Sequence, residues 1–396
     1  MDQTLFDELQ GTFSTQGATE AIDQLIARLK EQKEYGSLFY ALLMKKRQEL
    51  GVSPVPTGPA SDLPSAVHEP YEEGIRQAAR LVGNLFLEQG DIQQAWGYFR
   101  MLGEPQPVID ALEKYQPGEG EDSQGIIELA FHHGVHPRKG FEWVLQRFGI
   151  CSAITAMSGA LNGPNFPHGA EARDQCLKLL TRALCEQLVE RLRNDIVRQE
   201  GTAPETRSVP ALLAGRDWLM AEDNYHIDVS HLGAVIQMGS HLPRCEELTM
   251  LREMCAYGQR LSPQFQYRGE PPFEDQYKDY SVFYAILDGD NVEANLAHFH
   301  AKAENPNPDY SANLAAEMLV NLLLRLDRTA EALSVSRRFL ATADPRQLSC
   351  PNITELCRRV NDYRTLAEVS REQGDPVHFV AGLIAASSKP AHGNNR

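Results

Sequence analysis

The chain has 396 residues and a net charge of −16, with 54 acidic against 38 basic residues. Nucleic-acid binding relies on Lys and Arg at phosphates, and no basic block occurs here, so no nucleic acid is expected as a partner. No apolar run approaches the ~20 residues of a membrane-spanning helix, so no membrane partner is expected either. The acidic charge would suit a basic partner, whereas a simpler interpretation is a well-solvated surface.

The composition favours helix and a reducing compartment. Leu, Ala, Glu, Gln and Arg dominate while β-branched and aromatic runs are scarce, which predicts an all-α fold. The seven cysteines form no CxxC pair and fall mostly on apolar helix faces. They indicate reduced core thiols. The N-terminal residues are acidic and lack the apolar segment of a signal peptide, so we expect a cytoplasmic protein.

The first 70 residues predict a helix pair and a linker. Within residues 1–50, apolar spacing predicts helices at 19–33 and 35–50. Residues 51–70 contain five prolines and two glycines, which is typical of an extended spacer. A proline-rich strand that binds a partner is the alternative, but no basic residue flanks its prolines as such a motif would need.

The clearest pattern lies at 75–115, within a predicted helical segment at 71–161. One apolar helix face ends near Phe86, and Gly90 suits the left-handed residue after a helix end. Asp91 can cap the next helix, with Gln94 completing a capping box. The second apolar face comprises Ile92, Ala95, Trp96, Phe99 and Leu102. These features predict a helical hairpin.

Small and large residues alternate across this hairpin in a specific way. Gly83 and Ala95 occupy the small positions of the two helices, Phe99 is the large residue that fills the gap, and Pro107 closes the unit. This arrangement resembles the tetratricopeptide (TPR) repeat, although Ala79 stands where that family has a leading Trp. The resemblance implies an α-solenoid of helical hairpins that binds proteins or peptides. The alternative is an ordinary antiparallel helix pair.

The rest of the chain predicts further helices. The middle segment, 162–260, contains an uninterrupted helix at 170–200, longer than a repeat helix, and a shorter one at 209–220. The C-terminal segment, 261–388, reads as weaker helical repeats with a closing helix pair at 353–384. The tail, 389–396, is expected to be disordered.

Two groups of histidines are the only pattern that suggests chemistry. Glycine-rich phosphate loops, GxSxG, HExxH and DxDxDG are absent from the sequence. If segments 132–136 and 226–231 converged, imidazole and carboxylate groups could bind a divalent transition metal such as zinc. The candidate ligands are His132, His133, His136, His226, Asp228 and His231. The alternative is that these histidines stabilise helix ends and Asp228 is a helix cap.

An aromatic and acidic stretch is the candidate binding element. Residues 262–279 are rich in Pro, Tyr and charge and predict a loop. Aromatic residues supply rigid contact area and carboxylates attract basic groups, so the aromatic and acidic residues 265–284 could recognise a peptide. The candidate contacts are Phe265, Tyr267, Tyr277 and Tyr280. The alternative is a loop that merely covers the groove.

The sequence therefore predicts a TPR-like scaffold or adaptor that binds a protein or peptide through a helical groove, without catalysis or cofactor. A metal-dependent helical enzyme, built from segments 132–136 and 226–231, is the alternative from a different class. A structural oligomer that stacks end to end is a third hypothesis. The oligomeric state does not follow from the sequence.

Overall fold

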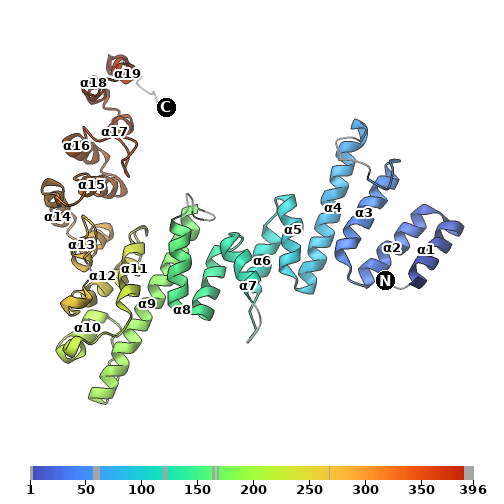
Figure 1. Cartoon of the computed structure of the whole chain (residues 1–396), viewed down its shortest axis with the longest axis horizontal. Helices are drawn as coiled ribbons and strands as arrows, with labels where there is room; N and C mark the ends of the chain where they lie inside the picture. The colour runs from blue at the N-terminus through green and yellow to red at the C-terminus, as the bar shows by residue number, and fades with distance from the viewer. Residues whose placement is uncertain are drawn as a thin grey trace, which may run out of the picture. The chain divides into compact units, whose positions relative to one another are not determined.

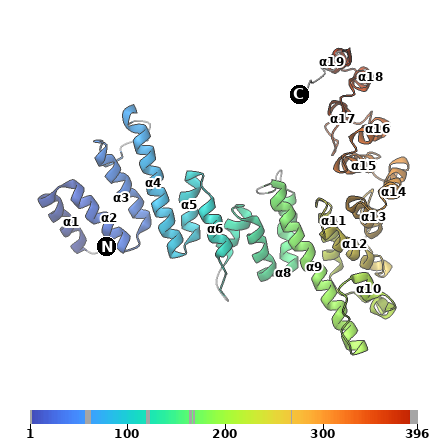
Figure 2. The same cartoon turned by 180° about the vertical axis from the view of Figure 1, so that it is seen from behind.

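The computed structural model describes residues 3–56, 63–118, 123–162, 166, 169–266 and 268–387. Over these residues the fold is all-α, as predicted, and β-pairing amounts to an isolated bridge between Arg268 and Asp275. The chain divides into two compact units, which are described separately. The N-terminal unit is Met1–Gly149 with Ala160–Cys176, and the C-terminal unit is Ile150–Gly159 with Leu177–Arg396. Figures 1 and 2 show the chain from two sides.

The N-terminal unit is a succession of helices that pack against their neighbours in the chain (Figure 1). They are α1 (Gln3–Gln16), α2 (Ala18–Glu31), α3 (Tyr35–Glu49), α4 (Ser65–Gln89), α5 (Ile92–Leu102), α6 (Gln106–Lys114) and α7 (Gln124–Ile127), followed by a π-helical turn at Glu128–His132. A core cluster joins α2, α3 and α4 through Leu29, Leu38 and Val82. Two helices contribute to both units, α8 (Pro137–Leu161) and α9 (Gly169–Glu200).

The predicted hairpin is present as α4 and α5. Gly90 ends α4 in the left-handed conformation, with φ of 85°. Asp91 caps α5, its side chain accepting from the backbone N of Gln94 at 3.0 Å. A Cβ placed on Gly83 would lie 2.8 Å from Cε2 of Phe99. The two helices therefore approach so closely that the ring of Phe99 covers the position where Gly83 has no side chain.

Two predictions for the first 70 residues are wrong. Residues 1–50 hold three helices rather than a pair, because α1 precedes the two that were predicted. The predicted linker at 51–70 ends early, since α4 begins at Ser65 and includes Pro70. Pro70 is the sixth residue of α4 and lies inside the helix, where it removes one backbone N–H donor without ending the helix.

The C-terminal unit continues with shorter helices; from α11 onward successive helices are again in contact, and α10 contacts α12. They are α10 (Val209–Leu213), α11 (Val229–Gly239), α12 (Glu247–Gly258), α13 (Gln276–Asp288), α14 (Val292–Glu304), α15 (Leu314–Arg325), α16 (Thr329–Phe339), α17 (Ile353–Val360), α18 (Tyr363–Glu372) and α19 (Pro376–Ser387). Two 3-10 segments, Asp217–Asp223 and Pro263–Phe265, connect some of them.

Several boundaries in this unit differ from the predictions. The uninterrupted helix at 170–200 is confirmed as α9. The helix predicted at 209–220 stops at Leu213, since Ala214 is already extended. The closing pair at 353–384 is three helices, because Asn361 ends α17 in the left-handed conformation. The predicted tail at 389–396 lies outside the described residues.

Cysteine burial agrees largely with the sequence analysis. All seven thiols are free, and five are buried, whereas Cys151 is exposed. Burial raises the pKa of Cys176 and of Cys185 to about 12. These two thiols therefore remain protonated and behave as apolar core groups.

One helix in the described part of the chain, α8, has the length and apolar composition of a membrane span. This differs from the prediction that no apolar run approaches the length of a membrane-spanning helix. Gly149, with φ of 74° and ψ of −176°, interrupts the helical conformation near its middle. Each piece is then shorter than the ~20 helical residues that cross a bilayer.

Candidate functional site

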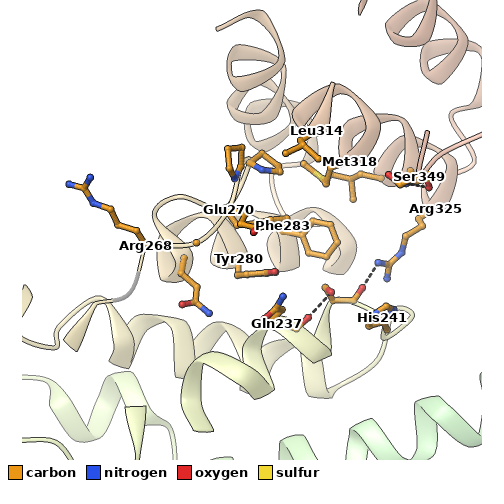
Figure 3. Close-up of a pocket in the computed structure, with 18 residues that line it drawn as sticks. Gln237, His241, Arg268, Glu270, Tyr280, Phe283, Leu314, Met318, Arg325 and Ser349 are labelled. Atoms are coloured by element: carbon orange, nitrogen blue, oxygen red, sulfur yellow. Dashed lines mark hydrogen bonds between the residues drawn. The ribbon is translucent and has the colours of Figure 1, made fainter. Parts of the chain in front are cut away.

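A cavity of about 710 Å³ opens in the C-terminal unit between α11, α13, α15 and the segment 268–273 (Figure 3). Its lining mixes aromatic, amide and charged side chains. The residues are Gln237, Ser240, His241, Arg268, Gly269, Glu270, Pro271, Pro272, Phe273, Gln276, Tyr280, Phe283, Leu314, Met318, Asn321, Leu322, Arg325 and Ser349. Three helices, the segment 268–273 and the segment carrying Ser349 thus contribute to a single concave site.

Aromatic packing holds the loop wall of the cavity in place. The ring of Phe273 stacks on Tyr280, with centroids 4.0 Å apart and planes at 8°. It also meets Phe283 and Phe299 edge-on, at 5.8 and 5.9 Å. Stacked and edge-to-face rings stabilise each other beyond their buried area. The loop is therefore part of the core through Phe273, while its Arg268 and Glu270 are exposed.

A buried carboxylate also stabilises the position of this loop. Asp279, on α13, is 1 % exposed. Its Oδ2 accepts from the backbone N of Asp275 and from Nζ of Lys302, both at 2.9 Å. Its Oδ1 lies 2.7 Å from Nε2 of His298. Because a buried carboxylate is stable only when such donors surround it, Asp279 couples α13, α14 and the loop.

Lys302 also pairs with a second carboxylate, Glu274, whose Oε2 accepts at 2.5 Å. Burial pushes the pKa of Glu274 up, but the hydrogen bond and charge of Lys302 outweigh it, so the pKa is lowered below 4.5. Because the pKa of Glu274 is lower in the folded state than in the unfolded state, its ionised form stabilises the fold at pH values above the unfolded pKa. This stabilisation is lost as the pH falls through the folded pKa.

A Lys302→Met variant is therefore expected to change how the free energy of unfolding depends on pH under acidic conditions. Without the cation, burial is opposed only by a backbone hydrogen bond and the charge of His298, so much of the stabilisation that is normally lost as Glu274 is protonated is absent from the start. Urea unfolding of the full chain between pH 6 and pH 3, in steps of about half a pH unit, measures the free energy of unfolding. This free energy should decrease less with falling pH in the variant than in the wild type. Lys278→Met, at an exposed lysine of α13, is the control. An unchanged slope in Lys302→Met would contradict the assignment.

Arg325 forms the opposite wall. Its Nη1 donates to the carbonyl of Ser240 at 2.6 Å, and Nη2 donates to the carbonyl of Leu242. Its guanidinium lies over the ring of Phe283, 5.5 Å from the centroid. The carbonyls at a helix C-terminus attract cations, so Arg325 ties the end of α15 to the end of α11.

The segment carrying Ser349 is fixed to α15 as well. The buried Glu317 accepts from the backbone N of Ser349 at 2.8 Å and from its Oγ at 2.5 Å. Nδ2 of Asn321 donates to the carbonyl of Ser349 at 3.2 Å. The walls are therefore held by specific hydrogen bonds, which pre-organise the cavity before any ligand arrives.

The predicted peptide contacts are placed differently from the expectation. The loop ends at Asp275, so Tyr277 and Tyr280 belong to α13, where they are 1 % and 7 % exposed. Their burial leaves little surface for a partner, although Tyr280 lines the cavity. Phe265 is half-buried and packs against Tyr225, with ring centroids 5.2 Å apart. Tyr267 lies outside the described residues.

The first group of predicted metal ligands is engaged in the N-terminal unit. His132 and His133 are exposed, and Nε2 of His133 lies 3.9 Å from a carboxylate oxygen of Glu128. Nε2 of His136 lies 2.7 Å from Oε2 of Glu113. These contacts are those of histidines near helix ends that pair with neighbouring carboxylates.

The second group has structural partners too. Nδ1 of the buried His226 lies 3.1 Å from the hydroxyl oxygen of Tyr257, and burial lowers the pKa of His226 despite the opposing charge of Asp195. Asp228 caps α11, accepting from the backbone N of Ser230 at 2.8 Å and, more weakly, from that of His231. Over the described residues, no group of three or more His, Cys, Asp or Glu side chains is arranged to hold a metal ion.

Comparison of the chain with protein-family models, with curated proteins and with solved structures found no match. Its function is therefore inferred from the cavity itself. The lining contains two arginines and one glutamate, so it is locally more basic than a chain of net charge −16. Amide side chains beside aromatic rings suit a polypeptide segment that presents both backbone groups and an apolar side chain.

Proposed function

We propose that this chain is a TPR-like interaction protein that binds a short segment of a partner protein in the cavity between α11, α13 and α15. The observation that carries the proposal is the lining of that cavity, where aromatic rings, amides and Arg325 meet in one pre-organised space, while Arg268 at its edge points outward (Figure 3). The close approach of Gly83 and Phe99 in the α4–α5 hairpin supports the TPR-like part.

The lining favours a particular chemistry for the bound segment. Met318, with the small exposed part of Tyr280 and Phe283, can contact an apolar side chain, and the amides of Gln237 and Gln276 can pair with its backbone. The exposed Arg268 would attract a carboxylate. We therefore propose an acidic segment with an apolar anchor, in contrast to the basic partner that net charge alone suggested.

Selection of random peptides displayed on phage against the full chain tests this proposal. The selected peptides should be enriched in Asp or Glu next to an apolar residue. Met318→Asp and Arg268→Glu should each weaken their binding by about tenfold or more, because central anchors dominate affinity. Arg346→Glu, at an arginine whose side chain is 89 % exposed and which lies outside the cavity lining, is the matched control. Peptides that bind all three variants equally would contradict a role for this cavity.

A further inference from the structure

The last helix of the described chain, α19, is packed on one side and bare on the other. Gly382 is buried against α18, where a Cβ would lie 2.9 Å from the carbonyl oxygen of Tyr363 and from the backbone N of Ala367. At about 100° per residue, Val377, Val380 and Ile384 lie on the face opposite Gly382. They are 73, 50 and 62 % exposed. Among the described residues of the C-terminal unit, nothing covers this apolar stripe.

An apolar groove lies at the start of the N-terminal unit. It has a volume of about 380 Å³ and is formed by α1, α2, α3 and the residues just after α3. Its lining is Leu9, Gln10, Phe13, Ala18, Ala21, Ile22, Leu25, Met44, Gln48 and Pro54. Phe13 at its edge and Phe6 nearby on α1 are 59 and 57 % exposed. The groove is therefore open and rimmed by aromatic surface.

Both surfaces lack charge in a chain whose residues are 23 % charged. No Asp, Glu, Lys or Arg occurs among the groove residues or within the sequence of α19, PVHFVAGLIAAS. Depletion of charge marks the buried core of protein interfaces, and an apolar helix face laid in a groove is a recurrent mode of recognition. The two surfaces therefore match each other in chemistry.

Other covers for these surfaces fit less well. The longest stretches outside the described residues, 57–62, 119–122 and 388–396, contain no Leu, Ile, Val, Met, Phe, Tyr or Trp that could cover an apolar face. At 12 residues α19 is too short to span a bilayer, and it has no basic residue for anionic lipid. By contrast, the groove of α1, α2 and α3 is apolar and uncharged like the exposed face of α19, so a second copy of the chain provides a matching surface.

We propose that α19 of one copy docks into the α1–α2–α3 groove of a second copy. Such an interface is heterologous, because it joins two different surfaces. A bound pair therefore still presents one free groove, on the copy that contributes α19, and one free α19, on the copy that contributes the groove. This association is independent of the cavity between α11, α13 and α15, so either proposal can fail without the other.

Light scattering of the full chain, combined with two variants, tests the proposal. Phe13→Asp places a charge in the groove and Ile384→Asp places one on the stripe, both at exposed positions. The average mass of the wild type should rise with concentration, and each variant should associate at least about tenfold more weakly. An equimolar mixture of the two variants should form a one-to-one dimer, because it contains one intact groove and one intact helix per pair.

Met101→Asp, at a 54 % exposed position of α5, is the control and should associate as the wild type does. Circular dichroism of all variants verifies that the fold is retained. A wild type of constant monomer mass would overturn the proposal. So would undiminished association of either variant alone, since that would reveal contact between like surfaces, and so would a mixture that stays monomeric. Binding of the monomer to neutral or anionic lipid vesicles, lost in Ile384→Asp, would assign α19 to a membrane surface instead.

Discussion

A Phe99→Ala variant is expected to lose about 4 kcal/mol of the free energy that holds α4 against α5. Phe99 is 1 % exposed, and its ring lies over Gly83 at a distance that leaves no room for a Cβ. Removal of the ring leaves a cavity between two helices whose separation is set by that contact, so the site collapses only partly. Native-state hydrogen exchange of the full chain, read on the amides of α4 and α5, measures the loss within this unit.

Two further variants sharpen this prediction. Gly83→Val should also destabilise the hairpin, by about 1–3 kcal/mol, because the added side chain meets the ring of Phe99. Phe148→Ala removes an aromatic ring that is 53 % exposed in the same unit and should cost less than about 0.5 kcal/mol. If exchange in α4 and α5 were equally affected by Phe99→Ala and Phe148→Ala, the interhelical contact would not be what stabilises the hairpin.

An Asp279→Asn variant is expected to lose about 3 kcal/mol in the C-terminal unit, because it breaks a buried ion pair while leaving Lys302 in place. The amide oxygen can still accept from Lys302 and the backbone of Asp275, but the amide carries no charge to pair with Lys302, and its N–H donors then face Nε2 of His298. The pairing of Lys302 with Glu274 limits the loss. Urea unfolding gives the free energy, and exchange of the 268–275 amides gives the local effect.

The control for this prediction is Asp290→Asn. Asp290 pairs with Arg252 at 2.7 Å, but its side chain is 47 % exposed, so its loss should cost less than about 1 kcal/mol. Equal stabilities of Asp279→Asn and Asp290→Asn would show that burial does not make the Asp279 network important. If the exchange of residues 268–275 stayed slow in Asp279→Asn, the network would not be what fixes the loop wall of the cavity.

The stability of the loop wall and the proposed binding are physically linked. Asp279 and Lys302 line no part of the cavity, yet they hold the segment that does. A binding partner that contacts residues 268–273 benefits from a loop that is already ordered, since less conformational entropy is lost on binding.

Local features of the fold follow from the sequence because they depend on neighbouring residues. Gly90 and Asp91 predict the turn and cap of the α4–α5 hairpin, since a left-handed residue and a side-chain acceptor act within one turn of chain. The absence of Gly and Pro from 170–200 likewise predicts α9. The Asp228 cap is a further case, and it was already the alternative to a metal ligand.

Burial and pairing over long separations were decided only by the tertiary structure. The Tyr and charged residues of the aromatic stretch predict an exposed loop with contact surface. In the structure Tyr277 belongs to α13 instead, and its side chain is buried in the core. His298 and Asp279 are 19 residues apart on two helices, and Arg325 reaches a carbonyl 85 residues away. No periodicity in the sequence predicts such contacts, because they depend on which amphipathic helices pack against one another in the folded chain. The sequence by itself determined the all-α class and the helix ends at Gly90–Asp91 and Asp228, where local hydrogen bonds dominate. The packing of helices decided the cavity, because its walls come from segments far apart in the chain.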